Sequence, residues 1–359
     1  MTPSSSISRI EKIKTIHDLK SNFDLGNEQL SDLIKQVEDK PSDMEIERYF
    51  KGFDAEDIFR FIFSVLPWSK LVIRLDQEQL PSYSKKNYQV PDFLMYYEDN
   101  KIKDNAVLVE VKSVDEDKMK LKLMKKQVES LLNFSQCLKV PLVFAIYWKK
   151  YTAWVVTSVE YFEKRGSKYI IDFEESFKND LSLFMSHFSF IIPENLFIRT
   201  LYQKVRPLPN AHENKKYGFI TKQEISFDNI NYISLELTEA SLLYSFLNFK
   251  NIESREGEKT IIVRKNSARF IAKPSYVMMK FLSSNKLKIN SQFSYFAANV
   301  MFNLFRKLSF KEFYILPSLS SKTGDEIFSK AFSDDQIFEL YKSRPYTKNS
   351  FKSVSYTHL

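Results

Sequence analysis

The chain has 359 residues, of which 43% are hydrophobic, and its formal net charge is +8 at pH 7. This length fits about two domains, and the hydrophobic content excludes a chain that is disordered throughout. The basic balance favours a polyanionic partner.

Glycine and cysteine usage excludes further classes of protein. None of the six glycines lies close enough to another to build GxGxxG or GxxxxGK[ST], so an ATP-driven motor or a dinucleotide enzyme of the usual kinds is not expected. The single cysteine and the scattered histidines exclude a structural zinc site. Without a secretory signal or a run of about 18 apolar residues, a cytoplasmic protein with no membrane partner is expected.

Helices are expected at the start of the chain. Residues 1–42 predict a serine-rich start and one or two short amphipathic helices. Ser42 is a candidate N-cap for the next helix, which runs through MEIERYFKGFDAEDIFRFIFSV. We expect this helix to break near Gly52, to restart with Asp54 as N-cap, and to stop at Pro67.

Strands and one helix follow. The expected strands are KLVIRLD (70–76), PDFLMYYE (91–98), AVLVEVKS (106–113), LVFAIYW (142–148) and AWVVTSVEYF (153–162). Residues 116–138 have helical periodicity and separate the third strand from the fourth. This order predicts a mixed α/β layer in which the helix returns the chain to a parallel position.

Three charges interrupt the second and third of these strands. Glu110 and Lys112 share one face of a strand because side chains alternate between faces. An antiparallel register centred near Lys101 sets Asp92 opposite Glu110. Two facing carboxylates repel, and a divalent cation such as Mg²⁺ removes that cost because it prefers hard oxygen ligands. Lys112 would then hold a phosphate oxygen or an attacking water.

Pro91-Asp92 followed by Glu110-Val111-Lys112 resembles the PD-(D/E)xK motif of the restriction-endonuclease-like nuclease superfamily. The element order is similar to that superfamily's core of helix, three strands, helix and strand. The resemblance implies that Asp92, Glu110 and the Val111 carbonyl bind Mg²⁺ or Mn²⁺, and that Lys112 orients or helps deprotonate the water.

Two further residues are implied by the same resemblance. The subset similar to Holliday junction resolvases also uses a glutamate from the preceding helix, for which Glu56 is the candidate. Many members carry a glutamine on the following helix, and Gln127 fits that position. The expected reaction is hydrolysis of a phosphodiester bond by a cation-activated water.

Two groups of basic residues are candidates for binding nucleic acid. Lys118, Lys122, Lys125 and Lys126 are expected largely on one side of the helix at 116–138, where they could track DNA phosphates or simply face solvent. Basic residues greatly outnumber acidic ones between Leu243 and Lys311. The candidates there are Arg264, Lys265 and Arg269, although a protein–protein surface is a rival interpretation.

The chain is therefore expected to hold five regions. These are an N-terminal helical extension (1–42), a nuclease-like α/β domain (43–175), a connecting segment (176–218), a basic α+β domain (219–345) and a mobile tail (346–359). The leading hypothesis is a metal-dependent endodeoxyribonuclease, with a homodimer or protein partner left open. The alternatives are a non-catalytic nucleic-acid-binding or assembly subunit, and a partner-dependent nuclease of a defence or transposition complex.

Overall fold

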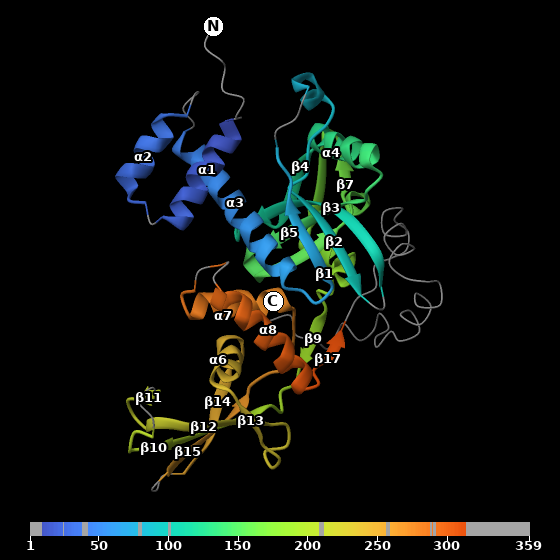
Figure 1. Cartoon of the computed structure of the whole chain (residues 1–359). Coiled ribbons are helices and arrows are strands. Elements are labelled where there is room, and N and C mark those ends of the chain that lie inside the picture. Colours follow the sequence, from blue (N-terminus) through green and yellow to red (C-terminus); the bar gives the residue numbers. More distant parts are fainter. Residues whose placement is uncertain are drawn as a thin grey trace. The chain divides into compact units, whose positions relative to one another are not determined.

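The computed structural model describes residues 9–23, 25–37, 42–77, 81–99, 102–207, 212–255, 259–287, 289 and 292–313 (Figure 1). The chain divides into two compact units, of which the first ends at His187 and the second begins at Phe188. The tail expected at 346–359 lies outside the described residues. Of the helices that the structure describes, none is long and apolar enough to cross a membrane.

The first unit opens with three helices, α1 (Arg9–Asn22), α2 (Asn27–Lys35) and α3 (Asp43–Ser64). Ser42 caps α3 as predicted, because its Oγ accepts a hydrogen bond from the Glu45 backbone N–H at 3.3 Å. The expected break near Gly52 is wrong, since α3 is continuous. One glycine costs a helix only about 1 kcal/mol. Buried side chains anchor the helix on both sides of Gly52, with Ile46 before it and Phe53 and Phe59 after it.

A five-stranded mixed sheet forms the centre of this unit. Its strands, in spatial order, are β1 (Ser69–Arg74), β2 (Phe93–Asp99), β3 (Ile102–Val114), β5 (Leu142–Trp148) and β6 (Ala153–Thr157). Strands β3 and β5 are parallel, and the other neighbours are antiparallel. The chain crosses between the two parallel strands through α4 (Lys125–Leu138), so the predicted helix crossover is confirmed.

One helix covers each face of this sheet. On one face, Phe59 of α3 stacks near Phe93 of β2, with ring centroids 5.3 Å apart. On the other face, Val128 of α4 joins Phe144 and Ile146 of β5 in a buried apolar cluster. The residues at even positions of β3 share the α4 side, because Leu108 and Glu110 pair in register with Leu142 and Phe144. Glu110 is thus a charged position within an apolar layer.

The helix expected over 116–138 begins later than predicted. Residues Lys120–Met124 form strand β4, which pairs with β8 (Lys168–Asp172), and β8 pairs in turn with β7 (Glu163–Arg165). The sequence KLKLM alternates exposed and buried side chains with a period of two. Leu121 also fits the apolar side of an amphipathic helix. Pairing of β4 with β8 explains why the segment is a strand and not a helix.

Short elements complete the first unit. The last strand of the main sheet ends at Thr157, before the Phe162 expected from the sequence. The remaining helices are α5 (Phe173–Lys178) and the 3-10 turns at Ser82–Lys86, Lys149–Tyr151, Val159–Tyr161 and Ser182–Met185.

The second unit combines two sheets with three helices. The larger sheet has the spatial order β11 (Glu213–Asn214), β12 (Gly218–Ser226), β10 (Phe197–Gln203), β15 (Lys259–Asn266) and β14 (Phe249–Arg255), with β13 (Ile233–Leu235) also on β12. The smaller sheet has the order β16 (Phe270–Ala272), β9 (Ser189–Ile192) and β17 (Lys311–Phe313). The helices are α6 (Leu237–Phe246), α7 (Pro274–Ser284) and α8 (Gln292–Lys307).

The connecting segment expected over 176–218 instead contains structure of both units. The first unit continues to His187, and strands β9, β10 and β11 of the second unit follow. Pro207, one of the prolines that suggested a linker, follows β10 without interrupting it. Strand β10 itself alternates half-buried and buried residues, as a strand in a sheet does.

Candidate functional site

Asp92 and Glu110, the two carboxylates of the motif, lie opposite each other, as expected from the sequence. Strands β2 and β3 pair Phe93 with Val109 and Leu94 with Leu108, so the same register sets Asp92 opposite Glu110. Asp92 lies just before β2, and its Oδ2 accepts a hydrogen bond from the Val111 backbone N–H at 2.7 Å. This bond fixes the Asp92 carboxylate against β3.

Glu110 and Lys112 are in close contact on the same face of β3. The Lys112 Nζ lies 2.5 Å from Glu110 Oε1 and donates to the Val111 carbonyl at 3.0 Å. The ammonium therefore occupies the point at which two of the expected metal ligands converge. Glu110 is 2% exposed, and its Oε2 is buried with no hydrogen-bond partner among the residues that the structure describes.

Glu56 comes to this group from α3. Its Oε2 lies 3.0 Å from Lys14 Nζ of α1 and 3.5 Å from Arg74 Nη2 of β1. Burial and the nearby charge of Asp92 raise the pKa of the Glu56 carboxyl, while Lys14 and Arg74 oppose that rise. The expected part of Glu56 in the site remains a prediction.

The protonation of Glu110 follows from its surroundings. Burial raises the pKa of Glu110 to about 8, with a further contribution from Asp92 and partial compensation by Lys112. Burial alone would lower the pKa of Lys112, but Glu110, Asp92 and Glu56 together raise it. Without another cation, the metal-free site therefore favours a protonated Glu110 and a charged Lys112.

The donor set fits a hard divalent cation. Carboxylate and carbonyl oxygens are the ligands that Mg²⁺ and Mn²⁺ take in proteins. Asp92, Glu110 and the Val111 carbonyl supply such oxygens from adjoining positions of β2 and β3. The unpartnered Oε2 of Glu110 is an unsatisfied oxygen that a cation would bind once Glu110 has lost its proton.

Gln127 lies in the first turn of α4, on the helix that follows the motif. Its side chain is half-buried. Its expected part in the site remains a prediction.

The four lysines expected on one helix face do not share one. Lys118 lies in the turn before β4 and pairs with Asp115 at 3.1 Å, whereas Lys122 is exposed on β4 itself. Lys125 and Lys126 begin α4. The helical-face arrangement was wrong because the strand period governs residues 120–124. All four side chains still lie along the chain directly after the motif.

The basic candidates of the second unit also separate. Arg264 lies on β15 and is half-buried, with its Nη1 3.0 Å from the Tyr244 hydroxyl of α6. Lys265, the next residue on the strand, has its ammonium 5.7 Å from the centre of the Phe197 ring. Arg269 is exposed in the loop after β15. The contact with Tyr244 holds the Arg264 guanidinium on the side of the sheet that α6 covers.

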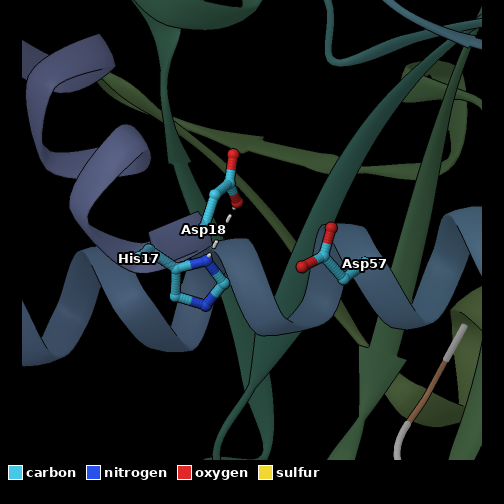
Figure 2. Close-up of side chains that lie close together, drawn as sticks. All are labelled: His17, Asp18 and Asp57. Atoms are coloured by element: carbon cyan, nitrogen blue, oxygen red, sulfur yellow. Dashed lines mark hydrogen bonds and ion pairs between the residues drawn. The ribbon is translucent and has the colours of Figure 1, made fainter. Parts of the chain in front are cut away.

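A second cluster with the residue types of a metal site lies between α1 and α3 (Figure 2). His17, Asp18 and Asp57 place ligand atoms within 4.8 Å of one another. The His17 Nε2 is 2.9 Å from Asp54, and Asp57 is 2.8 Å from Arg74. Burial alone would lower the pKa of His17, but bonds to Asp54 and Asp18 raise it. The carboxylates of this cluster thus already have partners within the protein, in the His17 imidazole and the Arg74 guanidinium.

Sequence reasoning could not find this second cluster. Its histidine and its aspartates come from two helices whose packing is set by apolar contacts, among them Ile13, Ile16 and Phe53. No spacing along the chain relates the two helices.

Comparison with known proteins bears on the first site. Residues 79–185 match the family model described as archaeal Holliday junction resolvase (hjc). The matched range includes Asp92, Glu110, Lys112 and Gln127, and it leaves out Glu56. The predicted resemblance is therefore confirmed over this part of the chain.

Two further comparisons concern curated proteins and solved structures. A search of curated proteins finds no match. Among solved structures, the chain is similar to Archaeoglobus fulgidus Hjc, described as a Holliday junction resolvase from an archaeal hyperthermophile. The identity is 18% over 38% of this chain and 95% of that chain, with a TM-score of 0.29.

Proposed function

Residues 79–185 carry a domain of the restriction-endonuclease-like superfamily, and from this premise we propose that the chain is a nuclease that hydrolyses phosphodiester bonds in DNA with a divalent cation. Asp92, Glu110 and the Val111 carbonyl would hold the cation. The observation that carries this proposal is the buried, unpartnered Oε2 of Glu110 beside a second carboxylate.

Such an oxygen is costly in a site built for stability alone. A buried polar atom without a partner costs roughly 1–3 kcal/mol, and more when it carries charge. A hydrophobic residue at position 110 would fit the layer formed by Leu108 and Phe144. Retention of a carboxylate there supports a role in binding a cation that arrives from solution.

A bound Mg²⁺ would supply charge neutralisation and a water of lowered pKa. The remaining roles belong to side chains of the protein. Lys112, once it no longer pairs with Glu110 Oε1, can donate to a phosphate oxygen or to the attacking water. Lys14 and Arg74 hold the Glu56 carboxylate in a fixed orientation next to the site. Gln127 is proposed to help position the water from α4.

The substrate that we propose is branched DNA, with the four-way junction as the first form to test. The family model that matches residues 79–185 is described by that activity. The net charge of +8 is consistent with a DNA substrate.

Cleavage of a labelled four-way junction and of supercoiled plasmid, with Mg²⁺ or Mn²⁺, tests this proposal. We expect the intact chain to cut, and we expect Asp92→Asn, Glu110→Gln and Lys112→Met each to lower the rate by about 100-fold or more. Chelation of the cation should abolish cleavage by the intact chain. A duplex of the same arm sequence distinguishes junction cleavage from general cleavage.

Matched controls remove charge of the same kind elsewhere in the first unit. Asp32→Asn, Glu174→Gln and Lys35→Met change exposed side chains of helices away from β2 and β3, and they should leave the rate unchanged. Equal background cleavage by the intact chain and all six variants would contradict a nuclease. The non-catalytic binding subunit would then be the better description.

A further inference from the structure

The large sheet of the second unit has two different faces. Along β10, Ile198, Thr200 and Tyr202 are buried, and the Thr200 hydroxyl lies 3.2 Å from the Tyr244 hydroxyl of α6. Phe197 and Leu201 point the other way and are half-buried. Figure 1 shows α6 against one side of these strands, with none of the second unit's described helices on the opposite side. We refer to that second side as the open face.

The open face gathers cations from four strands. The strand register sets Lys265 opposite Phe197 and Lys259 opposite Gln203, while Lys250 lies opposite Lys265. On the other side of β10, Lys222 lies opposite Leu201 and Glu224 opposite Arg199. Directly opposed residues of antiparallel strands share a face. The cations of the open face are therefore Arg199, Lys222, Lys250, Lys259 and Lys265.

Among the described side chains, carboxylates neutralise two of these five cations, and the register sets one further acidic position, Glu253, opposite Val263 on this face. Glu224 is the one carboxylate among the described side chains that β10, β12, β14 and β15 direct to this face, and Arg199 and Lys222 both bind it, at 2.7 and 2.6 Å. Among the side chains that the structure describes, no carboxylate pairs with Lys250, Lys259 or Lys265. Another acidic residue, Glu213, lies on the edge strand β11, which pairs with β12.

The spacing of the cations suits an extended polyanion. Lys259 and Lys265 lie six residues apart on β15, which corresponds to about 20 Å of strand. Each strand of duplex DNA carries one phosphate per about 3.4 Å of helix axis, so several phosphates fit along this distance. Lysine binds phosphate as a point charge and needs no fixed direction of approach. Lysines spread along a strand therefore suit the evenly spaced phosphates of a nucleic acid backbone rather than one particular small ligand.

We propose that the open face of the second unit docks the sugar–phosphate backbone of duplex DNA through Lys250, Lys259 and Lys265, with Arg199 and Lys222 beside them. The choice of DNA among polyanions rests on the proposed function, whereas the docking surface itself does not. Arg264 takes no part, because it contacts Tyr244 on the helix-covered side of the sheet. The docking surface lies outside the part of the chain that matches the resolvase family.

The test compares two variants of the full chain with equal loss of charge. The open-face variant is Lys250→Gln, Lys259→Gln and Lys265→Gln. The control is Lys280→Gln, Lys286→Gln and Arg306→Gln, on and after the helices α7 and α8. Both carry Asp92→Asn and are kept in EDTA, so that binding is measured without cleavage. Fluorescence anisotropy then gives the Kd for duplex DNA and duplex RNA across a salt series.

We expect the open-face variant to bind duplex DNA at least about tenfold more weakly near 0.1 M salt and to lose about 2–3 from the slope of log K against log salt. The control should bind within about twofold of the parent, and Lys→Arg at the same three positions should restore binding. Unchanged binding by the open-face variant, equal weakening by both variants, or an effect on RNA alone would overturn the proposal. Because no cleavage is involved, failure here leaves the nuclease test undecided, and the reverse also holds.

Discussion

Glu110 is the residue on which the chemistry of the site depends. It lies in an apolar layer, 2% exposed, with one oxygen held by Lys112 and the other without a partner among the described residues. Its burial, together with the charge of Asp92, raises the pKa of Glu110 to about 8. At neutral pH, the metal-free protein therefore favours the protonated carboxyl, whereas a metal ligand must be deprotonated.

Metal binding at this site should accordingly depend on pH. Because the cation displaces a proton from Glu110, the apparent affinity for Mn²⁺ should rise by up to about tenfold per pH unit below the Glu110 pKa of about 8 and level off above it. Calorimetric titration with Mn²⁺ at pH 6, 7, 8 and 9 measures this rise. Buffers of different ionisation enthalpy report the released proton.

Glu110→Gln is the informative comparison for that measurement. A glutamine has no proton to release, so the variant should bind Mn²⁺ weakly and without the steep dependence on pH. An affinity that is flat between pH 6 and 8 in the intact chain would contradict the protonated Glu110.

The sequence allowed much of this residue-level arrangement to be predicted. Strand alternation and a loop centre near residue 101 were enough to set Asp92 opposite Glu110, and the register of β2 and β3 agrees. The Lys112 contact with both Glu110 and the Val111 carbonyl could not be foreseen, because it depends on a side-chain conformation. Nor could the contact of Lys14 with Glu56, which depends on how α1 packs against α3.

At the scale of elements, two glycines have opposite structural roles. Gly52 lies inside α3, and a Cβ built there would meet no atom within 4 Å. Gly218 begins β12 with a φ of +90°, and a Cβ there would lie 2.5 Å from the Gln203 carbonyl oxygen. The first glycine is thus a cost to its helix, and the second is required by its turn.

Alanine substitution should separate these two roles. Gly52→Ala should raise the free energy of unfolding by roughly 0.5–1 kcal/mol, since alanine is the better helix former. Gly218→Ala should lower it by more than about 1 kcal/mol, because of the strained φ and the clash with Gln203. Chemical denaturation of each variant, followed by circular dichroism, measures both changes. A destabilising Gly52→Ala would mean that α3 does not run unbroken through this position.

The elements that the sequence could predict are those whose residues suit few other structures. Strands with long apolar runs, such as Leu142–Trp148, were placed with the observed bounds because few other structures suit such a run. The break expected at Gly52 and the helix expected over 120–124 both came from local rules. Tertiary packing of aromatic residues overrode the first, and pairing with β8 overrode the second.

At the scale of the whole molecule, the structure divides between two units with different surfaces. The first unit carries the acidic site between β2 and β3, and the second carries the open face, where Lys250, Lys259 and Lys265 pair with no carboxylate among the described side chains. The basic segment recognised in the sequence includes Lys250, Lys259 and Lys265. It could not reveal that Arg264 faces the helices or that Arg199 and Lys222 join the lysines, because these placements depend on sheet register.

The boundary between the units was also hidden from sequence reasoning. Prolines and polar residues around 204–218 suggested a linker, whereas the division lies between His187 and Phe188. A short, apolar stretch such as SFII at β9 carries no boundary signal of its own. Only its pairing with β16 and β17 assigns it to the second unit.

Anomalous scattering from a crystal of the full chain soaked in Mn²⁺ would show whether Asp92 and Glu110 share a cation. We expect an anomalous peak within about 2.5 Å of carboxylate oxygens from both residues, with the Lys112 ammonium moved away from Glu110 Oε1. A peak only at His17, Asp18 and Asp57, or no peak beside Glu110 at pH 8.5, would contradict this expectation.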